Sequence, residues 1–370
     1  MWRLDAATGK LVWRQALDDR VIGLTLAGPR LLAASEGGKL YVIDAEEGRL
    51  AGVVAFTQPL RTAAAASERG DRIYVVGEHS VIYTLAAEDL SCAGVWYTGH
   101  APGEITAPPV ALLNKVLIAE NAGNDSSRVR ILKTDAQGVV AGEATSDRLL
   151  GRIVTPLAVS GRRVAVATTL GQLAAYEVSG AEGRGSLTPL ARREGSARQP
   201  LAPHLLLHDG HLWIAAQSLA KLAILPTENQ FSLVSLERDF PRDVFDATPQ
   251  AIDDLVIHVR RSQGATGAVV AATNAKTNRA LWETAVAVPL AGAPAAAGPL
   301  DLSLIAANGA AYRLDRQAMV RGVQDRAERP TGIPIKTPLT HAVELGEGRL
   351  AAGADGAATL VLSGPGGVRS

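Results

Sequence analysis

Cysteine is nearly absent from this chain. Cys92 is the single cysteine among 370 residues, so neither an intrachain disulfide nor a cysteine-based zinc site can form. Aromatic residues are also scarce, at 4%, although hydrophobic residues as a whole reach 47%. We therefore expect a core built mainly of Ala, Val, Leu and Gly, which suits closely packed layers of small side chains.

An excess of charge of one sign is missing too. The 37 Lys and Arg residues balance the 37 Asp and Glu residues, which argues against a nucleic-acid partner or a polybasic membrane anchor. The least polar run, residues 285–300, contains three prolines and is too short for a membrane-spanning helix. The first residues lack the pattern of a signal peptide. The sequence alone leaves the compartment unknown.

A short unit recurs along the whole chain. Pairs such as Thr155-Pro156 and Ala202-Pro203 precede apolar strands at intervals of 39 to 48 residues. Each unit continues with a turn, a second strand, a Gly-led third strand such as "GQLAAYE", and a fourth strand. No stretch keeps a helical period. Four antiparallel strands repeated at this interval are typical of a β-propeller blade.

We therefore expect an all-β, eight-bladed β-propeller of four-stranded antiparallel blades, formed by residues 1–370 as a single domain. The segment "WRLDAATGKLVW" matches the end of a third strand followed by a complete outer strand, whereas the last unit stops after its third strand. We expect residues 11–17 to lie beside residues 359–362 and close the ring. The abrupt start also fits a module of a larger protein. Blades are expected to begin near residues 21, 60, 105, 153, 200, 246, 291 and 335.

The segment "LDAATGKLVW" resembles the tryptophan-docking motif of pyrroloquinoline-quinone-type propellers, through Asp5, Gly9 and Trp13. In that motif the Asp accepts N–H groups of a turn, the Gly adopts positive φ, and the Trp fills the gap between blades. Less complete copies place Trp96 and Trp282 at the Trp position. We interpret all five residues as structural.

Some copies of the motif are eroded. In "EDLSCAGVW", Glu88 and Cys92 stand at the Asp and Gly positions. In "DAEEGRLAG", Gly52 stands at the Trp position. The turns are therefore expected to persist while the residues that define them vary.

The family contains quinoprotein alcohol and glucose dehydrogenases, and a non-catalytic branch typified by the lipoprotein subunit of the outer-membrane β-barrel assembly machinery. Resemblance to the enzymes of the family would imply a quinone held on a Trp floor, often against a vicinal disulfide, with calcium beside a catalytic Asp. One cysteine cannot form that disulfide, and no Trp lies on an expected innermost strand. We expect the non-catalytic branch, with no catalytic residue and no pyrroloquinoline quinone. An extracytoplasmic, periplasmic location is implied by the resemblance alone.

Two sets of residues mark an expected binding face. The polar loop "ENAGNDSSR", residues 120–128, should lengthen a connection on that face through Asn121, Asn124, Asp125 and Arg128. Its oxygen atoms make calcium an alternative occupant. Residues just before the inner strands should ring the central channel on the same face: Arg20, Arg61, Glu104, Arg152, Asp246 and Lys336.

We expect a scaffold that binds protein or peptide partners on this face, either by strand addition at the outer edges or by docking at the channel mouth. The alternative is an enzyme that uses the channel: a quinone-linked oxidoreductase, or a lyase or hydrolase. The expected inner strands, such as "TAAAAS" and "APAAAG", are Ala-rich and uncharged. This composition favours the scaffold.

Overall fold

The computed structural model of the chain consists of β-strands, and no α-helix occurs among the residues it describes. Within the same residues, no helix has the length and apolar character needed to cross a membrane. The all-β expectation is confirmed. The described residues are 1–4, 11–180, 187–195, 201–237, 243–245, 247–262, 267–286, 289–290, 293–298, 301–307, 311–315, 348–352 and 358–362.

The chain divides into two compact units. The middle unit comprises Asp19–Leu212 and Leu222–Leu233. The terminal unit comprises Met1–Asp18, Trp213–Lys221 and Val234–Ser370. The predicted number of blades stays a prediction.

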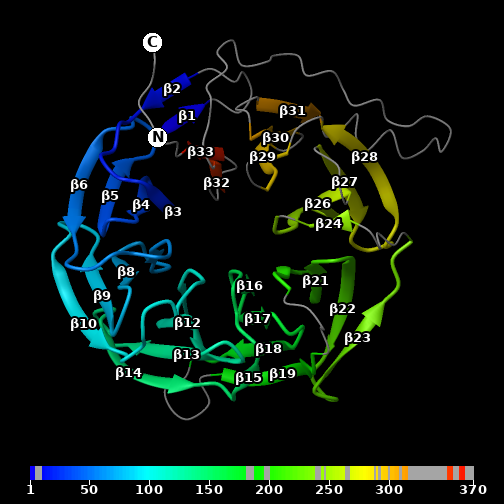
Figure 1. Cartoon of the computed structure of the whole chain (residues 1–370), viewed down its shortest axis with the longest axis horizontal. Coiled ribbons are helices and arrows are strands. Elements are labelled where there is room, and N and C mark those ends of the chain that lie inside the picture. The colour runs from blue at the N-terminus through cyan, green and yellow to red at the C-terminus, as the bar shows by residue number, and fades with distance from the viewer. Residues whose placement is uncertain are drawn as a thin grey trace. The chain divides into compact units, whose positions relative to one another are not determined.

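Four sheets follow one another in the middle unit, and their strands pair antiparallel in chain order, with β15 added beside β13 (Figure 1). The first sheet contains β3 (Val21–Ala27), β4 (Arg30–Ser35), β5 (Lys39–Asp44) and β6 (Leu50–Ala55). The second contains β7 (Ala65–Ala66), β8 (Arg72–Val76), β9 (Val81–Ala86) and β10 (Cys92–Tyr97). The third contains β11 (Val110–Leu112), β12 (Lys115–Ala122), β13 (Ser126–Thr134), β14 (Val140–Thr145) and β15 (Leu149–Leu150). The fourth contains β16 (Ala158–Ser160), β17 (Arg163–Ala167), β18 (Leu173–Val178) and β19 (Leu187–Arg193).

Burial follows the position of a strand in its sheet. The second and third strands, such as β4 and β5, are buried along almost their whole length, whereas the outer strands β6 and β10 alternate between exposed and half-buried residues. Apolar clusters join neighbouring sheets: Leu32 and Val42 pack with Ile73 and Val75 of the next sheet. These second and third strands are apolar along most of their length because both of their faces are covered.

The turn before an outer strand keeps one backbone form although its sequence varies. Gly48 adopts a φ of 72° in the first sheet, and Leu90 adopts 64° at the equivalent place in the second. The Leu90 N–H donates to the carbonyl oxygen of Ala86 at 3.0 Å. The prediction that Glu88 and Cys92 take the Asp and Gly positions is therefore wrong, because Ala86 and Leu90 take them.

This correction also changes the place of one tryptophan. Trp282 stands eight residues after Asn274, which begins its turn, whereas Trp96 stands ten residues after Ala86. Gly94 occupies the place in β10 that corresponds to Trp282. Residues two apart on a strand share a face, so Trp96 still lies on the motif's face of its strand.

A fifth group of strands begins in the middle unit and crosses into the terminal unit. Arg192 of β19 lies in parallel register with Gln230 of β23, so the fourth and fifth groups join through their outer strands. The strands of this group are β20 (His204–His208), β21 (His211–Ala215), β22 (Leu219–Leu225) and β23 (Gln230–Val234).

The terminal unit holds the remaining strands, and its described core joins β26, β27 and β28 to β30. Strand β1 pairs with β2 and contacts β33. The first described strand thus contacts the last described one, but the expectation that residues 11–17 take this place is wrong, because β1 takes it. The strands are β1 (Trp2–Leu4), β2 (Leu11–Arg14), β24 (Asp243–Val244), β25 (Gln250–Ile252), β26 (Leu255–Ser262), β27 (Ala268–Asn274), β28 (Ala280–Val286), β29 (Ala295–Gly298), β30 (Asp301–Ile305), β31 (Ala311–Asp315), β32 (Gly348–Ala352) and β33 (Ala358–Leu362).

Candidate binding face of the middle unit

Two predicted rim residues, Arg20 and Arg61, belong to a row of alternating charges. Arg20 precedes β3 and lies 3.5 Å from Glu36, which follows β4. Arg61 precedes β7 and lies 3.5 Å from the same Glu36 and 2.8 Å from Glu78, which follows β8. The two arginines and Glu36 are about half exposed, so these ion pairs add little stability. They leave a row of charged groups accessible to a partner.

Three further predicted residues meet where the third and fourth sheets join. The Asn121 N–H donates to the carbonyl oxygen of Glu104 at 2.8 Å. The Asn121 amide also holds both backbone groups of Ile153: Nδ2 donates to its oxygen at 3.1 Å, and Oδ1 accepts from its N–H at 2.7 Å. Next to Ile153, Arg152 donates from Nη2 to the carbonyl oxygen of Gly103 at 3.0 Å. Asn121 therefore fixes the backbone that carries Arg152.

The expected polar loop at residues 120–128 is a hairpin. Strands β12 and β13 run up to Ala122 and from Ser126, and Asn121 lies opposite Ser127 in their register. The long-loop prediction is wrong because the strands are longer, not the connection. Asn121 is buried, and Asn124 and Asp125 are exposed in the tight turn.

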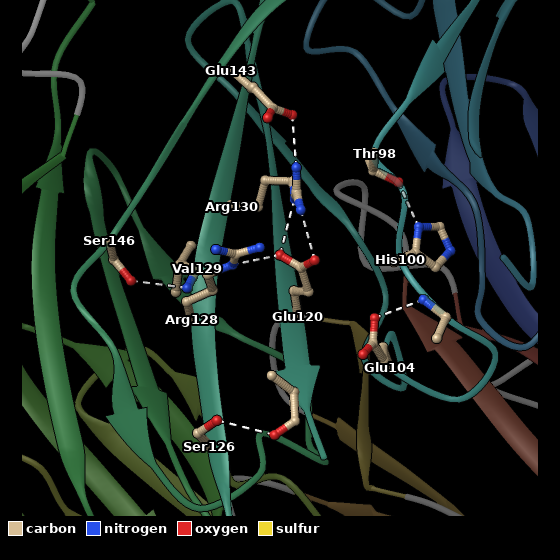
Figure 2. A network of polar contacts seen from close by, with 12 residues as sticks. Thr98, His100, Glu104, Glu120, Ser126, Arg128, Val129, Arg130, Glu143 and Ser146 are labelled. Atoms are coloured by element: carbon tan, nitrogen blue, oxygen red, sulfur yellow. Dashed lines mark hydrogen bonds and ion pairs between the residues drawn. The ribbon is translucent and has the colours of Figure 1, made fainter. Parts of the chain in front are cut away.

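Charged side chains of β12, β13 and β14 cluster in the third sheet, as Figure 2 shows. Arg130 donates from Nε and Nη2 to the two oxygens of Glu120, at 3.0 and 2.7 Å, and from Nη1 to Glu143 at 2.7 Å. Arg128 donates to Glu120 at 2.7 Å, and the Trp96 indole donates to Glu143 at 3.2 Å. The cluster thus links the second sheet to the third. We call these five residues the Arg130 cluster.

Glu120 and Arg130 keep their charges although both side chains are buried. Burial by itself would raise the pKa of Glu120, but hydrogen bonds from Arg130 and Arg128 outweigh burial and lower that pKa. Burial also opposes the charge of Arg130, and its bonds to Glu120 and Glu143 raise its pKa above the usual value. Glu120 and Arg130 therefore form a buried ion pair in which both charges are stabilised by hydrogen bonds.

His100 lies close to this cluster in Figure 2. Its ring lies 2.5 Å from the Thr98 hydroxyl and 3.1 Å from the Gly77 carbonyl oxygen. Burial lowers the pKa of His100, partly offset by the contact with Gly77. The imidazole is therefore neutral at pH 7, and it holds the segment that leads to Glu104.

Metal-binding groups are sparse in the part of the chain that the structure describes. It contains no group of three His, Cys, Asp or Glu residues that could hold a metal ion. Both oxygens of Glu120 accept hydrogen bonds from arginines, so this carboxylate is engaged. The calcium hypothesis therefore depends on the exposed turn with Asn124 and Asp125, and it stays a prediction.

The docking residues lie at sheet boundaries where they are described. Trp96 packs against the cluster formed by Val116, Ile118 and other residues, and Trp282 is buried with Leu302 of the next sheet. Trp13 is buried in β2. Four predicted site residues lie outside the described residues: Asp5, Gly9, Asp246 and Lys336.

Sequence reasoning missed the acidic partners of the rim. Glu36 and Glu78 each follow the second strand of their unit, in "SEGG" and "GEHS". That recurrence was a usable signal. No comparable signal pairs Arg130 with Glu120 and Glu143, because these residues meet only across strands.

Comparison with known sequences identifies a family. The profile described as "Outer membrane protein assembly factor BamB" matches residues 2–218, which is more than half of the chain. Among curated protein sequences, none matches significantly.

Solved structures with the same architecture are numerous. BamB from Moraxella catarrhalis has 18% identity and a TM-score of 0.62, with 94% of this chain and 98% of that chain covered. A quinohemoprotein alcohol dehydrogenase from Pseudomonas putida HK5 has 11% identity and a TM-score of 0.58, with 82% and 66% covered. The β-propeller domain of Swd1 from Myceliophteria thermophila has 12% identity and a TM-score of 0.51, with 80% and 95% covered. The fold is a β-propeller.

Proposed function

The chain belongs to the family of the outer membrane protein assembly factor BamB, and from this premise we propose that it is a non-catalytic propeller that binds protein partners. The observation that carries the proposal is the row of Arg20, Glu36, Arg61 and Glu78, in which arginines before two inner strands alternate with glutamates that follow two second strands. Such a surface suits a polar interface in which charge pairing sets orientation and association rate.

The surroundings of this row support binding rather than chemistry. Its carboxylates face arginines, and the inner strand next to it contains "TAAAAS", which offers no acid, base or nucleophile apart from hydroxyls. The description of the family places its function in outer-membrane protein assembly. We therefore propose an extracytoplasmic protein whose partner is an assembly component or a client of that process.

Capture of partners by rim variants tests the proposal. Tagged protein is incubated with an extract of the source organism, and bound proteins are identified by mass spectrometry. Arg61→Ser should reduce recovery of the partner about tenfold, since a lost interfacial ion pair costs about 1.4 kcal/mol or more. Tyr97→Ser is the matched control, because Tyr97 is exposed on the outer strand β10 and belongs to none of the ion pairs of the rim.

Two outcomes would contradict the proposal. One is a reproducible absence of any partner. The other is tight binding of pyrroloquinoline quinone with calcium in a calorimetric titration, which would favour the quinone-linked enzyme. If Tyr97→Ser abolishes capture and Arg61→Ser does not, binding uses the outer strands instead of the rim.

A further inference from the structure

Two lysines lie opposite each other at one end of the third sheet. Lys115 is the first residue of β12, and it faces Lys133 of β13 in the antiparallel register. Residues directly opposite each other have their side chains on the same face, and like charges in such a pair destabilise a sheet. Asn121, which belongs to the rim, lies at the other end of β12, about 20 Å away at the rise of a strand.

The face that carries these lysines packs against the fourth sheet. Leu117 and Ile131 form the next pair of the register on the same face, since residues two apart on a strand point the same way. They belong to one apolar cluster with Val164 and Tyr176 of the fourth sheet. The two lysines therefore lie at the end of the boundary between the two sheets, just beyond its apolar layer.

A third positive charge comes from the fourth sheet. Arg162 lies in the turn between β16 and β17, and its Nε donates to the carbonyl oxygen of Val178 at 3.2 Å. Burial lowers the pKa of Lys115, and the positive charges of Lys133 and Arg162 lower it further. Three cations from two sheets therefore act on one another at this place.

The charge of Lys115 is poorly compensated. The residue is only 5% exposed, and the hydrogen bond of its Nζ to the carbonyl oxygen of Leu113 is long, at 3.5 Å. No carboxylate of the described residues forms an ion pair with this amine. The acid beside Arg162 is Glu177, at 4.0 Å from its Nε. A buried charge without a close counter-ion is costly, so an anion bound here would stabilise the fold.

An anion can approach these cations from solvent. The Arg162 side chain is 55% exposed, and Lys133 is half-buried. Gly142 of β14 lies beside Lys133 in the register, and a Cβ built there would have no described atom within 4 Å apart from its chain neighbours. Lys133 and Arg162 are therefore the groups that an anion contacts. Lys115, which is covered, contributes through its charge.

We propose that Lys133 and Arg162 bind a phosphate group at this end of the boundary between the third and fourth sheets, with the charge of Lys115 strengthening the site. A phosphate ester carries a charge of about −1.5 to −2 at pH 7 and several acceptor oxygens, whereas a carboxylate carries a single charge. Lysine serves as a point charge for such a group, and arginine donates two parallel N–H groups. Inorganic phosphate and a phosphate ester share this chemistry. The site does not depend on the proposed function, because the rim lies at the other end of β12.

Calorimetric titration of the whole chain tests the site, at pH 7 and constant ionic strength, with inorganic phosphate, glycerol 3-phosphate and acetate. Phosphate should bind saturably and at least about tenfold more tightly than acetate. Lys133→Gln and Arg162→Gln should each weaken phosphate binding about fivefold or more. Lys276→Gln is the matched control, because Lys276 is an exposed lysine paired with Asp254. It should leave phosphate binding unchanged.

Thermal melting gives a second readout that does not require a contact with Lys115. In chloride, Lys115→Met should melt at a higher temperature than the wild-type chain, because a buried charge facing another lysine is removed. Phosphate should raise the melting temperature of the wild-type chain and raise that of Lys115→Met less. A normal melting transition also shows that each variant is folded.

Several results would overturn the site: no saturable binding of phosphate, equal affinity for phosphate and acetate, or a loss in Lys276→Gln as large as that in Lys133→Gln. An equal rise of the melting temperature in Lys115→Met and the wild-type chain would remove Lys115 from it. Tighter binding of glycerol 3-phosphate than of inorganic phosphate would support the site and identify its ligand as an ester. The reverse order would support it as a site for the free anion.

Discussion

Two sheets of this protein bury an arginine between two carboxylates, and they do so with different bonds. In the third sheet, Arg130 contacts Glu120 through two nitrogen atoms and Glu143 through a third. In the sheet of β26 to β28, the described ion pairs of Arg260 join Nη1 to Asp243, at 3.0 Å, and Nη2 to Glu283. Both guanidinium groups are buried, with exposed side-chain fractions of 6% and 5%.

The exposure of the carboxylates explains why the two arrangements should contribute differently to the free energy of unfolding. Glu120 is as buried as its arginine, at 6%, whereas Asp243 is 13% and Glu283 is 42% exposed. A carboxylate that reaches water loses less when its arginine is removed. Removal of the arginine from the Arg130 cluster should therefore destabilise the fold more than removal of Arg260, although the two arginines are equally buried.

Removal of the arginines should give the largest effects. Arg130→Met leaves Glu120 buried with Arg128 alone and should lower the free energy of unfolding by about 3–5 kcal/mol. Arg260→Met should cost about half as much, because both of its carboxylates are more exposed than Glu120. Urea unfolding at pH 7 measures both. Equal losses would show that exposure of the carboxylates does not set the difference.

Alkaline pH should reveal the contact that joins the second and third sheets. The Tyr74 hydroxyl donates to the Gly138 carbonyl oxygen at 2.9 Å, and burial, with a contribution from Asp71, raises the pKa of Tyr74 to about 12. The protonated Tyr74 hydroxyl stabilises the folded state fully below pH 10, the usual pKa of tyrosine. This stabilisation is lost as the pH rises from there through about 12. The loss should be on the order of 2 kcal/mol.

The measurement is unfolding free energy against pH, with tyrosinate absorbance recorded in parallel. Tyr74→Phe should remove this part of the alkaline loss and the late-titrating absorbance. A Tyr74 that titrates near its usual pKa of 10 would contradict the interpretation.

Acid should weaken the Arg130 cluster through Glu120. Its folded pKa is lowered below the usual value of 4.5, so its stabilisation is present above that pH and is lost as the pH falls through the folded pKa. Unfolding free energies below about pH 5 should fall less steeply in Glu120→Gln than in the wild-type chain. Burial lowers the pKa of His100 from 6.5, so His100 causes a further loss as the pH falls below 6.5, but this loss is common to both chains and cancels in the comparison. Parallel pH profiles would contradict the prediction.

The smallest effect concerns the two docking tryptophans. The Trp96 indole donates to Glu143 at 3.2 Å, whereas the buried Trp282 Nε1 has no acceptor among the described residues. A double-mutant cycle of Trp96→Phe with Glu143→Gln should give a coupling of about 1 kcal/mol. The matched cycle of Trp282→Phe with Glu283→Gln should give almost none. Similar couplings in both cycles would remove the distinction.

Much of the local structure could be predicted from the sequence, because turns and apolar runs are local signals. The strands around "GKLYVID" and "GQLAAYE" were predicted and are confirmed as parts of β5 and β18. The turn at Ala86 and Leu90 was missed, because a leucine at positive φ does not look like a glycine. The hairpin at residues 120–128 was missed for a related reason, since Asn and Ser are typical of loops and here Asn121, Ser126 and Ser127 continue two strands.

The sequence by itself determined that the chain is all-β, that it repeats, and that it resembles quinoprotein-type propellers, because period and turn chemistry act over a few residues. Only the tertiary structure decided which charges are paired. Arg61 and Arg152 occupy equivalent places in the sequence pattern, but acidic side chains from two sheets surround Arg61, and no described acid reaches Arg152. The physical reason is that an ion pair depends on distance in space, and residues that are far apart along the chain set that distance.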